Sequence, residues 1–267
     1  PENASWNTSI PIPIFGRAAA KSSTCVVDTS DEAEESIQIG PGTGILVSAS
    51  TLEPIARLGD MLLLEPSQSG IVDGDLVAAK TASGQTLLRR AWSDSNRWIL
   101  QAVNPVETTP CVVIGKQSAA LRKISGVIFS VVKGETIVSN DDEWKPIGLR
   151  VAELFHSLKA ITVVGDSLEP IAKSGHKVLI GNRFQGGTAS IEKGRLAVID
   201  STDSDIGYVI KRVFPRAGDW ILGSVNPVFP HEPLLVSTEK LRAVWPLSGV
   251  LFENHHAVTV TEPRGDE

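Results

Sequence analysis

Thr51-Leu52-Glu53-Pro54-Ile55-Ala56 is the segment from which the architecture of this chain can be predicted, because it returns at 167–172 as Ser-Leu-Glu-Pro-Ile-Ala. Three further blocks repeat in the same order. Trp98-Ile99-Leu100, Val103-Asn104-Pro105 and Ser125-Gly126-Val127 return at 220–222, 225–227 and 248–250. Collinear blocks of this kind indicate that one module is written twice, and such an internal repeat constrains the whole fold.

Each copy contains short apolar or alternating runs, separated by turns such as Asp73-Gly74 and Ser83-Gly84. Runs of this length between turn residues are typical of β-strands. The predicted strands are 45–47, 61–64, 75–79, 86–90 and 112–114 in the first copy, and 161–164, 177–180, 196–200 and 208–214 in the second. We therefore expect a mainly β protein with two tandem modules, whose cores contain the repeated Trp98 and Trp220.

The repeat and the composition between its copies divide the chain into five parts. These are an N-terminal linker at 1–11, the first module at 12–130, a linker at 131–145, the second module at 146–256 and a C-terminal tail at 257–267. Polar, charged and proline-rich termini cannot bury much apolar surface. We therefore expect residues 1–13, the acidic stretch 28–35 and the tail to be solvated and loosely ordered.

Composition excludes several classes of protein. The 267 residues include 25 Lys and Arg against 31 Asp and Glu, a net charge of −6, which excludes a generally basic nucleic-acid-binding surface. Cys25 and Cys111 lie in apolar runs, where we expect buried free thiols of a reducing compartment. No apolar run approaches the roughly 20 residues of a membrane span. Residues 1–4 lack a signal peptide's basic region, so we expect a cytoplasmic protein, and a start at proline predicts a fragment or a processed product.

The common cofactor and metal signatures are missing from the sequence. It contains no GxGxxG loop, no Walker A pattern and no CxxC or HExxH spacing. A Ser-His-Asp triad would have no GxSxG elbow to support it. The five histidines have no metal-ligand spacing, so we expect neither a metal nor a cofactor; they are His156, His176, His231, His255 and His256.

One serine and one lysine of the second copy remain as candidate catalytic residues. Gly165-Asp166-Ser167 ends a predicted strand in a turn, which leaves the Ser167 hydroxyl accessible. Lys211 follows 44 residues later in the apolar run Val209–Val213, where strand alternation places it on the face opposite its two neighbours. A lysine stripped of water favours its neutral amine and can deprotonate a serine. Taken alone the pair is weak, because most such pairs are a turn serine and a surface lysine.

Four motifs together resemble the LexA-like serine peptidases, which include phage repressor C-terminal domains and UmuD-type proteins. The motifs are GDSLEP at 165–170, VIKR at 209–212, WILGSVNP at 220–227 and LSGVLFE at 247–253. This resemblance implies a β-rich fold with a Ser-Lys dyad, in which Ser167 matches the nucleophile and Lys211 the general base. The backbone N–H groups of Asp166 and Ser167 would then stabilise the oxyanion. Signal peptidases share the dyad, but the missing membrane anchor and the Val-Asn-Pro block favour the LexA-like family.

The first copy departs from this pattern at both catalytic positions. Thr51 stands at the position of the serine and Arg89 at that of the lysine. Arginine stays protonated at physiological pH and cannot serve as a base. The first copy is therefore predicted to be a pseudo-peptidase.

LexA-like proteins usually cleave themselves in an upstream loop, stimulated by RecA filaments on single-stranded DNA. The resemblance therefore implies a RecA-filament-type activator and a scissile bond in this chain. We consider three candidate bonds, which are Ala20–Lys21, Lys133–Gly134 and Ala152–Glu153. Residues 12–20 resemble the stretch that carries the Ala-Gly bond of the repressors, with Lys21 in place of the glycine. Only 15 residues separate Ala152 from Ser167, so we expect the dyad of the second copy to be unblocked.

Three functional hypotheses stay open at this point. The first is the self-cleavage and dimerisation part of a LexA- or phage-repressor-like transcriptional regulator of a stress or SOS-type response. DNA would then be bound only through an N-terminal domain outside this chain. The two fused LexA-like copies would pack as an internal pseudo-dimer with one working site, giving a monomer where relatives self-associate as dimers. The second hypothesis is a peptidase that cleaves a partner protein in trans, and the third is a catalytically silent assembly or ligand-sensing scaffold.

Overall fold

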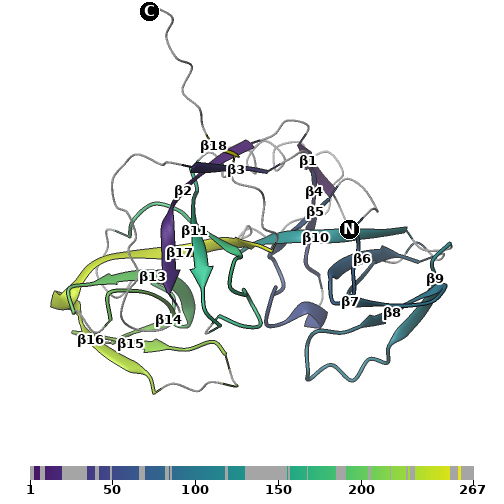
Figure 1. The fold of residues 1–267 in the computed structure, drawn as a ribbon. Coiled ribbons are helices and arrows are strands. Elements are labelled where there is room, and N and C mark those ends of the chain that lie inside the picture. Colours follow the sequence, from purple (N-terminus) through teal and green to yellow (C-terminus); the bar gives the residue numbers. More distant parts are fainter. Residues whose placement is uncertain are drawn as a thin grey trace, which may run out of the picture. The chain divides into compact units, whose positions relative to one another are not determined.

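The computed structural model describes residues 3–6, 10–19, 35–39, 42–48, 50–65, 70–81, 84, 86–117, 120–129, 155, 157–166, 168–184, 191–203, 206–216, 218–226, 228, 232–252 and 258–259. Within these ranges the chain is mainly β, as the sequence predicts (Figure 1). The strands pair predominantly in antiparallel fashion. Among the described residues, no helix has the length and apolar character that crossing a membrane requires.

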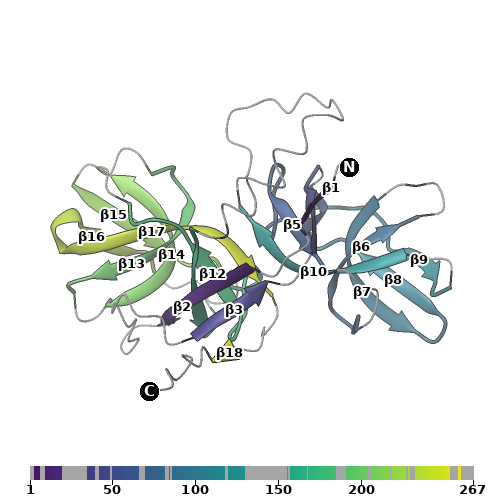
Figure 2. The same cartoon turned by 90° about the horizontal axis from the view of Figure 1, so that it is seen from above.

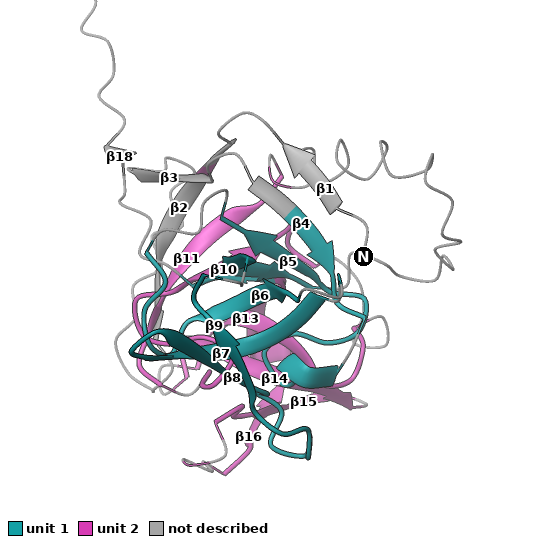
Figure 3. Ribbon diagram, turned by 90° about the vertical axis from the view of Figure 1, so that its right-hand side faces the viewer, with its two compact units in different colours: residues 1–8, 41–152, 249–252 teal, residues 9–40, 153–248, 253–267 magenta. Residues whose placement is uncertain are grey.

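The chain divides into two compact units (Figure 3). Unit 1 comprises Pro1–Thr8, Pro41–Ala152 and Gly249–Phe252, and unit 2 comprises Ser9–Gly40, Glu153–Ser248 and Glu253–Glu267. The division differs from the one expected from the repeat, because Ser9–Gly40 belongs to unit 2 and Gly249–Phe252 to unit 1. Both segments contain strands that pair with strands far away in the sequence, and the repeat pattern does not record such pairing.

Unit 1 contains eight strands that the structure describes. They are β1 (Asn3–Trp6), β4 (Gly42–Leu46), β5 (Met61–Leu64), β6 (Leu76–Lys80), β7 (Thr86–Asp94), β8 (Arg97–Gln101), β9 (Val112–Gly115) and β10 (Ala120–Ile128). The pairing order is β1-β4-β5-β10, continued from β10 as β6-β7-β8-β9. A 3-10 turn, η1 (Ser50–Leu52), follows β4. The core cluster contains Val77 and Leu100, with Trp98 packed against it as a partly buried side chain.

Unit 2 contains the remaining described strands. They are β2 (Ile10–Ala19), β3 (Glu35–Ile39), β11 (Lys159–Val164), β12 (Lys177–Ile180), β13 (Arg195–Ser201), β14 (Tyr208–Arg216), β15 (Asp219–Gly223), β16 (Leu234–Ser237), β17 (Leu241–Leu251) and β18 (Val258–Thr259). They pair as β17-β13-β14-β15-β16 and β12-β11-β2-β3-β18. The last residues of β17 belong to unit 1. Trp220 of β15 is 3 % exposed and lies in a core cluster with residues of β13, β14, β16 and β17, as expected.

All nine strands predicted from the alternating runs are confirmed, with ends that differ by a few residues. The expectation that residues 1–13 are loosely ordered was wrong for the strands in this range, which are β1 and the first four residues of β2. Isoleucine and proline alternate in β2, and Ile12 is fully buried. Pro11 and Pro13 pair with β3, whereas pairing with β11 begins only at Ile14. Proline lacks an N–H group, so it is tolerated where one side of a strand is unpaired.

The expectation of buried thiols was also wrong for Cys111, which is free and exposed. It directly precedes β9, whose Val113 is itself 54 % exposed. An apolar run at the edge of a sheet therefore placed this cysteine in solvent. Cys25 lies outside the described residues.

The two units repeat one another in their hydrogen bonds as well as in their sequence. The N–H of Gly59 donates to the Val47 carbonyl at 3.0 Å, and the N–H of Gly175 donates to the Val163 carbonyl at 2.9 Å. The turn that follows β4 or β11 is therefore closed in the same way in both units. One side-chain contact of this turn differs between the units. In unit 1 the Asp60 carboxylate accepts the N–H of Arg57, whereas in unit 2 the His176 imidazole accepts the N–H of Lys173.

We expect His176 to make unit 2 lose stability in acid. Burial, with a smaller effect of Lys173, lowers the pKa of His176 from 6.5 to about 4. Between these pH values the unfolded chain binds more protons than the folded one, so stability falls as pH drops. The loss should reach about 2 kcal/mol, allowing for the partial exposure of the imidazole. Urea unfolding of His176→Asn, which keeps an acceptor for the N–H of Lys173, should show a smaller loss between pH 7 and pH 4; an equal loss would contradict the assignment.

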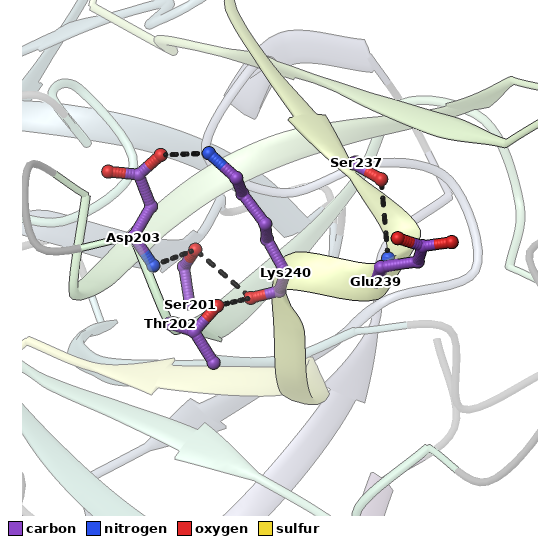
Figure 4. Close-up of polar contacts among 6 residues, drawn as sticks. All are labelled: Ser201, Thr202, Asp203, Ser237, Glu239 and Lys240. Carbon is purple, nitrogen blue, oxygen red and sulfur yellow. Dashed lines mark hydrogen bonds and ion pairs between the residues drawn. The ribbon is translucent and has the colours of Figure 1, made fainter.

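The β13–β14 hairpin of unit 2 is tied to η3 (Thr238–Lys240) by a group of polar contacts (Figure 4). The Lys240 carbonyl accepts hydrogen bonds from the Ser201 hydroxyl at 3.2 Å and the Thr202 hydroxyl at 3.1 Å. The Lys240 ammonium group in turn lies 3.0 Å from the Asp203 carboxylate. These contacts fix the loop between β13 and β14, and β14 carries Lys211.

Candidate active site

Lys211 lies in the interior face of the β13–β14 hairpin. Its side chain shares a strand face with Val209 and Val213, which are 2 % and 0 % exposed, and it pairs with Ala197 of β13. Lys211 itself is 5 % exposed. Because removal from water penalises the charged amine, burial lowers the pKa of Lys211 below its ordinary value. Burial therefore makes this amine easier to deprotonate than that of a free lysine, and a general base must be deprotonated to act.

The turn after β11 contains the predicted nucleophile. Ser167 lies outside the described residues, while Asp166 and Leu168 on either side of it are described. The N–H of Glu169 donates to the Asp166 carbonyl at 3.0 Å, which closes the turn, and Leu168 is fully buried. Glu169–Pro170 is a cis peptide, as is Glu53–Pro54 in unit 1, so both repeated Glu-Pro pairs form turns.

In unit 1 the structure brings the two degenerate positions together. The Thr51 hydroxyl donates to the Leu88 carbonyl at 3.1 Å, and Nη1 of Arg89 donates to the same oxygen at 2.9 Å. Arg89 is 5 % exposed, the same fraction as Lys211. Residues at the serine and lysine positions of the repeat are therefore neighbours, although their sequence positions are far apart.

Asn226 is a residue of this region that the sequence argument did not single out. It is 4 % exposed, and its Nδ2 donates to the Asp166 carbonyl at 2.8 Å. Asn104 makes the matching bond to the Ser50 carbonyl at 3.0 Å. The repeat contained a sequence signal for this asparagine. Val-Asn-Pro occurs in both copies, although neither asparagine lies in a strand.

Strand β2 lies alongside the candidate site, where it pairs in parallel with β11 (Figure 1) and, on its other side, with β3 (Figure 2). Its last residue, Ala19, pairs with Val164, which directly precedes the turn, and with Val209 of β14. The expectation of an unblocked dyad, based on the short segment between Ala152 and Ser167, stays a prediction. Strand β2, from the N-terminal part of the chain, lies beside the turn.

The candidate scissile residues themselves lie outside the described residues. They are Ala20, Lys21, Lys133, Gly134, Ala152 and Glu153. Ala20 and Lys21 directly follow the end of β2, so this pair alone is connected to a described strand beside the candidate site. Within the described part of the chain, no group of three or more His, Cys, Asp or Glu side chains could hold a metal ion.

Comparisons with known proteins add no assignment, because neither a protein-family model nor a curated protein matches this chain. The candidate site is therefore defined by its own residues: a buried lysine with a lowered pKa, a turn held by an asparagine, and a parallel strand beside both.

Proposed function

We propose that unit 2 is a serine-lysine peptidase of the LexA-like type and that unit 1 is its degenerate copy. The observation that carries the proposal is the burial of Lys211 on an apolar strand face, with its pKa lowered by desolvation. The contact of Thr51 and Arg89 with one carbonyl supports it, because the repeat gives Ser167 and Lys211 the equivalent positions. Because an arginine cannot serve as a general base, unit 1 would have no dyad and the chain would have one.

We further propose that the chain is its own substrate, with the bond after Ala20 as the scissile bond. Support comes from strand β2, which pairs with β11 and β14 and ends at Ala19. Ala19 lies opposite Val164, just before the turn of Ser167, and opposite Val209, which is two residues before Lys211 in the sequence. Holding the scissile segment beside the nucleophile replaces a bimolecular encounter with an intramolecular one. The product would be a chain that lacks its first 20 residues.

The chemistry follows from the state of the lysine. The neutral Lys211 amine takes the proton of the Ser167 hydroxyl while its Oγ attacks the Ala20 carbonyl carbon. The N–H groups of Asp166 and Ser167 would stabilise the resulting oxyanion. The Lys211 ammonium then protonates the leaving amine of Lys21, and the Ala20–Lys21 bond breaks. Water hydrolyses the acyl-enzyme, again with Lys211 as the base, and regenerates the free serine.

In the cell this peptidase would be the self-cleaving part of a LexA- or phage-repressor-like regulator. Fusion of two copies would supply within one chain the association that single-copy relatives obtain by dimerising. A RecA-filament-type activator would trigger the cleavage, and DNA would be contacted by a domain outside this chain.

The proposal is tested by following the intact mass of the wild-type chain and of Ser167→Ala at pH 7 and pH 10. Because high pH deprotonates Lys211, the wild type should cleave faster at pH 10, and its fragments should correspond to residues 1–20 and 21–267. Ser167→Ala should stay intact at both pH values. Fragments from both proteins, or from neither, would contradict self-cleavage by this dyad; an uncleaved wild type that still processes an added peptide would favour cleavage in trans.

A further inference from the structure

We propose that Asn226 is a positioning residue of this site, which aims an oxyanion-stabilising N–H group by holding the carbonyl oxygen of Asp166. The inference rests on the proposed function, because it gives Asn226 a role in the peptidase chemistry of unit 2. It goes further in assigning that role to a residue outside the dyad.

The geometry of Asn226 connects two loops that are 60 residues apart. Nδ2 donates to the Asp166 carbonyl at 2.8 Å, and Oδ1 accepts the N–H of Val228 at 2.9 Å. Both ends of the amide are therefore satisfied at a site where only 4 % of the residue is exposed. A buried amide with two partners has a single orientation, so the Asp166 carbonyl is held in a fixed direction.

The same clamp exists in unit 1, where more of its surroundings are described. Asn104 donates to the Ser50 carbonyl at 3.0 Å and accepts the N–H of Val106 at 3.0 Å. The N–H groups of Val103 and Asn104 also donate to the Thr51 carbonyl, at 2.9 and 3.1 Å. In unit 1 the loop thus holds both carbonyls around the position that corresponds to the nucleophile.

Peptide geometry makes this clamp relevant to catalysis. A trans peptide is planar, and its C=O and N–H groups point in opposite directions. A hydrogen bond that fixes the Asp166 carbonyl would therefore also orient the N–H of the same peptide group. This N–H belongs to Ser167 and is one of the two candidate oxyanion donors. Such donors are effective because they are aimed before charge develops on the substrate oxygen. Asn226 carries no charge, so its replacement by another uncharged residue should leave the basicity of Lys211 unchanged.

The test compares Asn226→Leu and Asn226→Ala with Asn104→Ala in the full chain. Asn226→Leu is uncharged and similar in size to asparagine but has no donor for the Asp166 carbonyl, while Asn104→Ala removes the matching bonds in the unit without a dyad. The first-order rate of self-cleavage is measured by intact mass from pH 7 to pH 10. We expect both Asn226 variants to be slowed by about 100-fold or more at every pH, with the pH midpoint of the wild type. Asn104→Ala should stay within about two-fold of the wild type while losing similar thermal stability.

Labelling with a fluorophosphonate separates failure of this inference from failure of the proposed function. In that reaction Ser167 Oγ bonds to phosphorus, fluoride leaves, the serine proton passes to Lys211, and the phosphoryl oxygen occupies the oxyanion site. If the wild type is labelled and Ser167→Ala is not, labelling should be slowed in the Asn226 variants as cleavage is. Equal rates in the Asn226 and Asn104 variants, or a shifted pH midpoint with an unchanged plateau, would overturn the positioning role alone. A wild type that neither cleaves nor reacts would overturn the proposed function and this inference together.

Discussion

Replacing Lys211 with methionine should abolish self-cleavage and at the same time stabilise unit 2. General-base catalysis contributes about 10²–10⁴-fold to such reactions, so we expect the cleavage rate to fall by about 10³-fold or more. Methionine keeps the length and the apolar stem of the side chain, which lies between Val209 and Val213 on one strand face. It removes an amine whose charged form is disfavoured by burial.

The stability gain should depend on pH in a defined direction. The unfolded chain has an ordinary lysine pKa, near 10.5, while the folded chain has a lower one. Between the two values the unfolded chain binds more protons, so the wild type becomes more stable as pH rises through this window. Each unit of lowering corresponds to about 1.4 kcal/mol of penalty below the window. Lys211→Met should be more stable than the wild type at pH 7 and should lose this slope.

Two further variants complete the experiment. Lys211→Arg should be inactive at every pH, because an arginine cannot serve as a general base; unit 1 has Arg89 at the matching position. Lys193→Met serves as the control, since Lys193 is an exposed lysine of the same unit, before β13. It should change neither activity nor the pH slope. Activity in Lys211→Met would exclude Lys211 as the base, whatever the stability result.

Alanine at Gly249 or at Gly126 should destabilise unit 1 by about 3 kcal/mol. The two repeated Ser-Gly-Val segments pair with each other there, with Val127 opposite Val250 in antiparallel register. A Cβ at Gly126 would lie 2.7 Å from the Val250 carbonyl oxygen, and one at Gly249 would meet the Val127 carbonyl oxygen more closely still. Both obstacles are backbone atoms, so no change of rotamer relieves the overlap. Only a shift of the two strands would make room.

Chemical denaturation of the two variants measures this effect. Gly223→Ala is the matched control, because its Cβ would make an ordinary 3.5 Å contact with the Phe214 ring. We expect a clearly lowered denaturation midpoint for Gly126→Ala and Gly249→Ala, and a change below about 1 kcal/mol for Gly223→Ala. Wild-type midpoints for all three would show that the repeated segments do not pair this closely.

Much of the secondary structure could be predicted from local patterns. Short apolar runs between turn residues located nine strands, because a strand with one buried face alternates every two residues whatever its partners are. The same alternation placed Lys211 on the strand face opposite its two neighbours. Patterns failed where the local signal was ambiguous: the Ile-Pro alternation of β2 was interpreted as a loosely ordered terminus, and the apolar surroundings of Cys111 as a core.

The candidate site was predictable in part and for a similar reason. Ser167 and Lys211 were singled out by a turn after a predicted strand, an apolar run and the LexA-like motifs, and Thr51 and Arg89 by their matching places in the repeat. All of these signals can be detected without a structure. Asn226 was passed over, since nothing in a sequence shows that its amide reaches a carbonyl 60 residues earlier. Its recurrence as Asn104 was a usable signal that became meaningful only with the hydrogen bonds.

The sequence alone determined the number of modules, the positions of most strands and the presence of arginine in the first copy where the second has Lys211. These properties depend on neighbouring residues and on side-chain chemistry. Tertiary structure decided that β2 joins unit 2 beside β11. It also decided that the end of β17, Gly249–Leu251, pairs with β10 in unit 1. A strand's own residues specify which of its faces is buried, whereas its backbone can pair with any free edge of suitable length and direction. The choice among those edges depends on the whole chain.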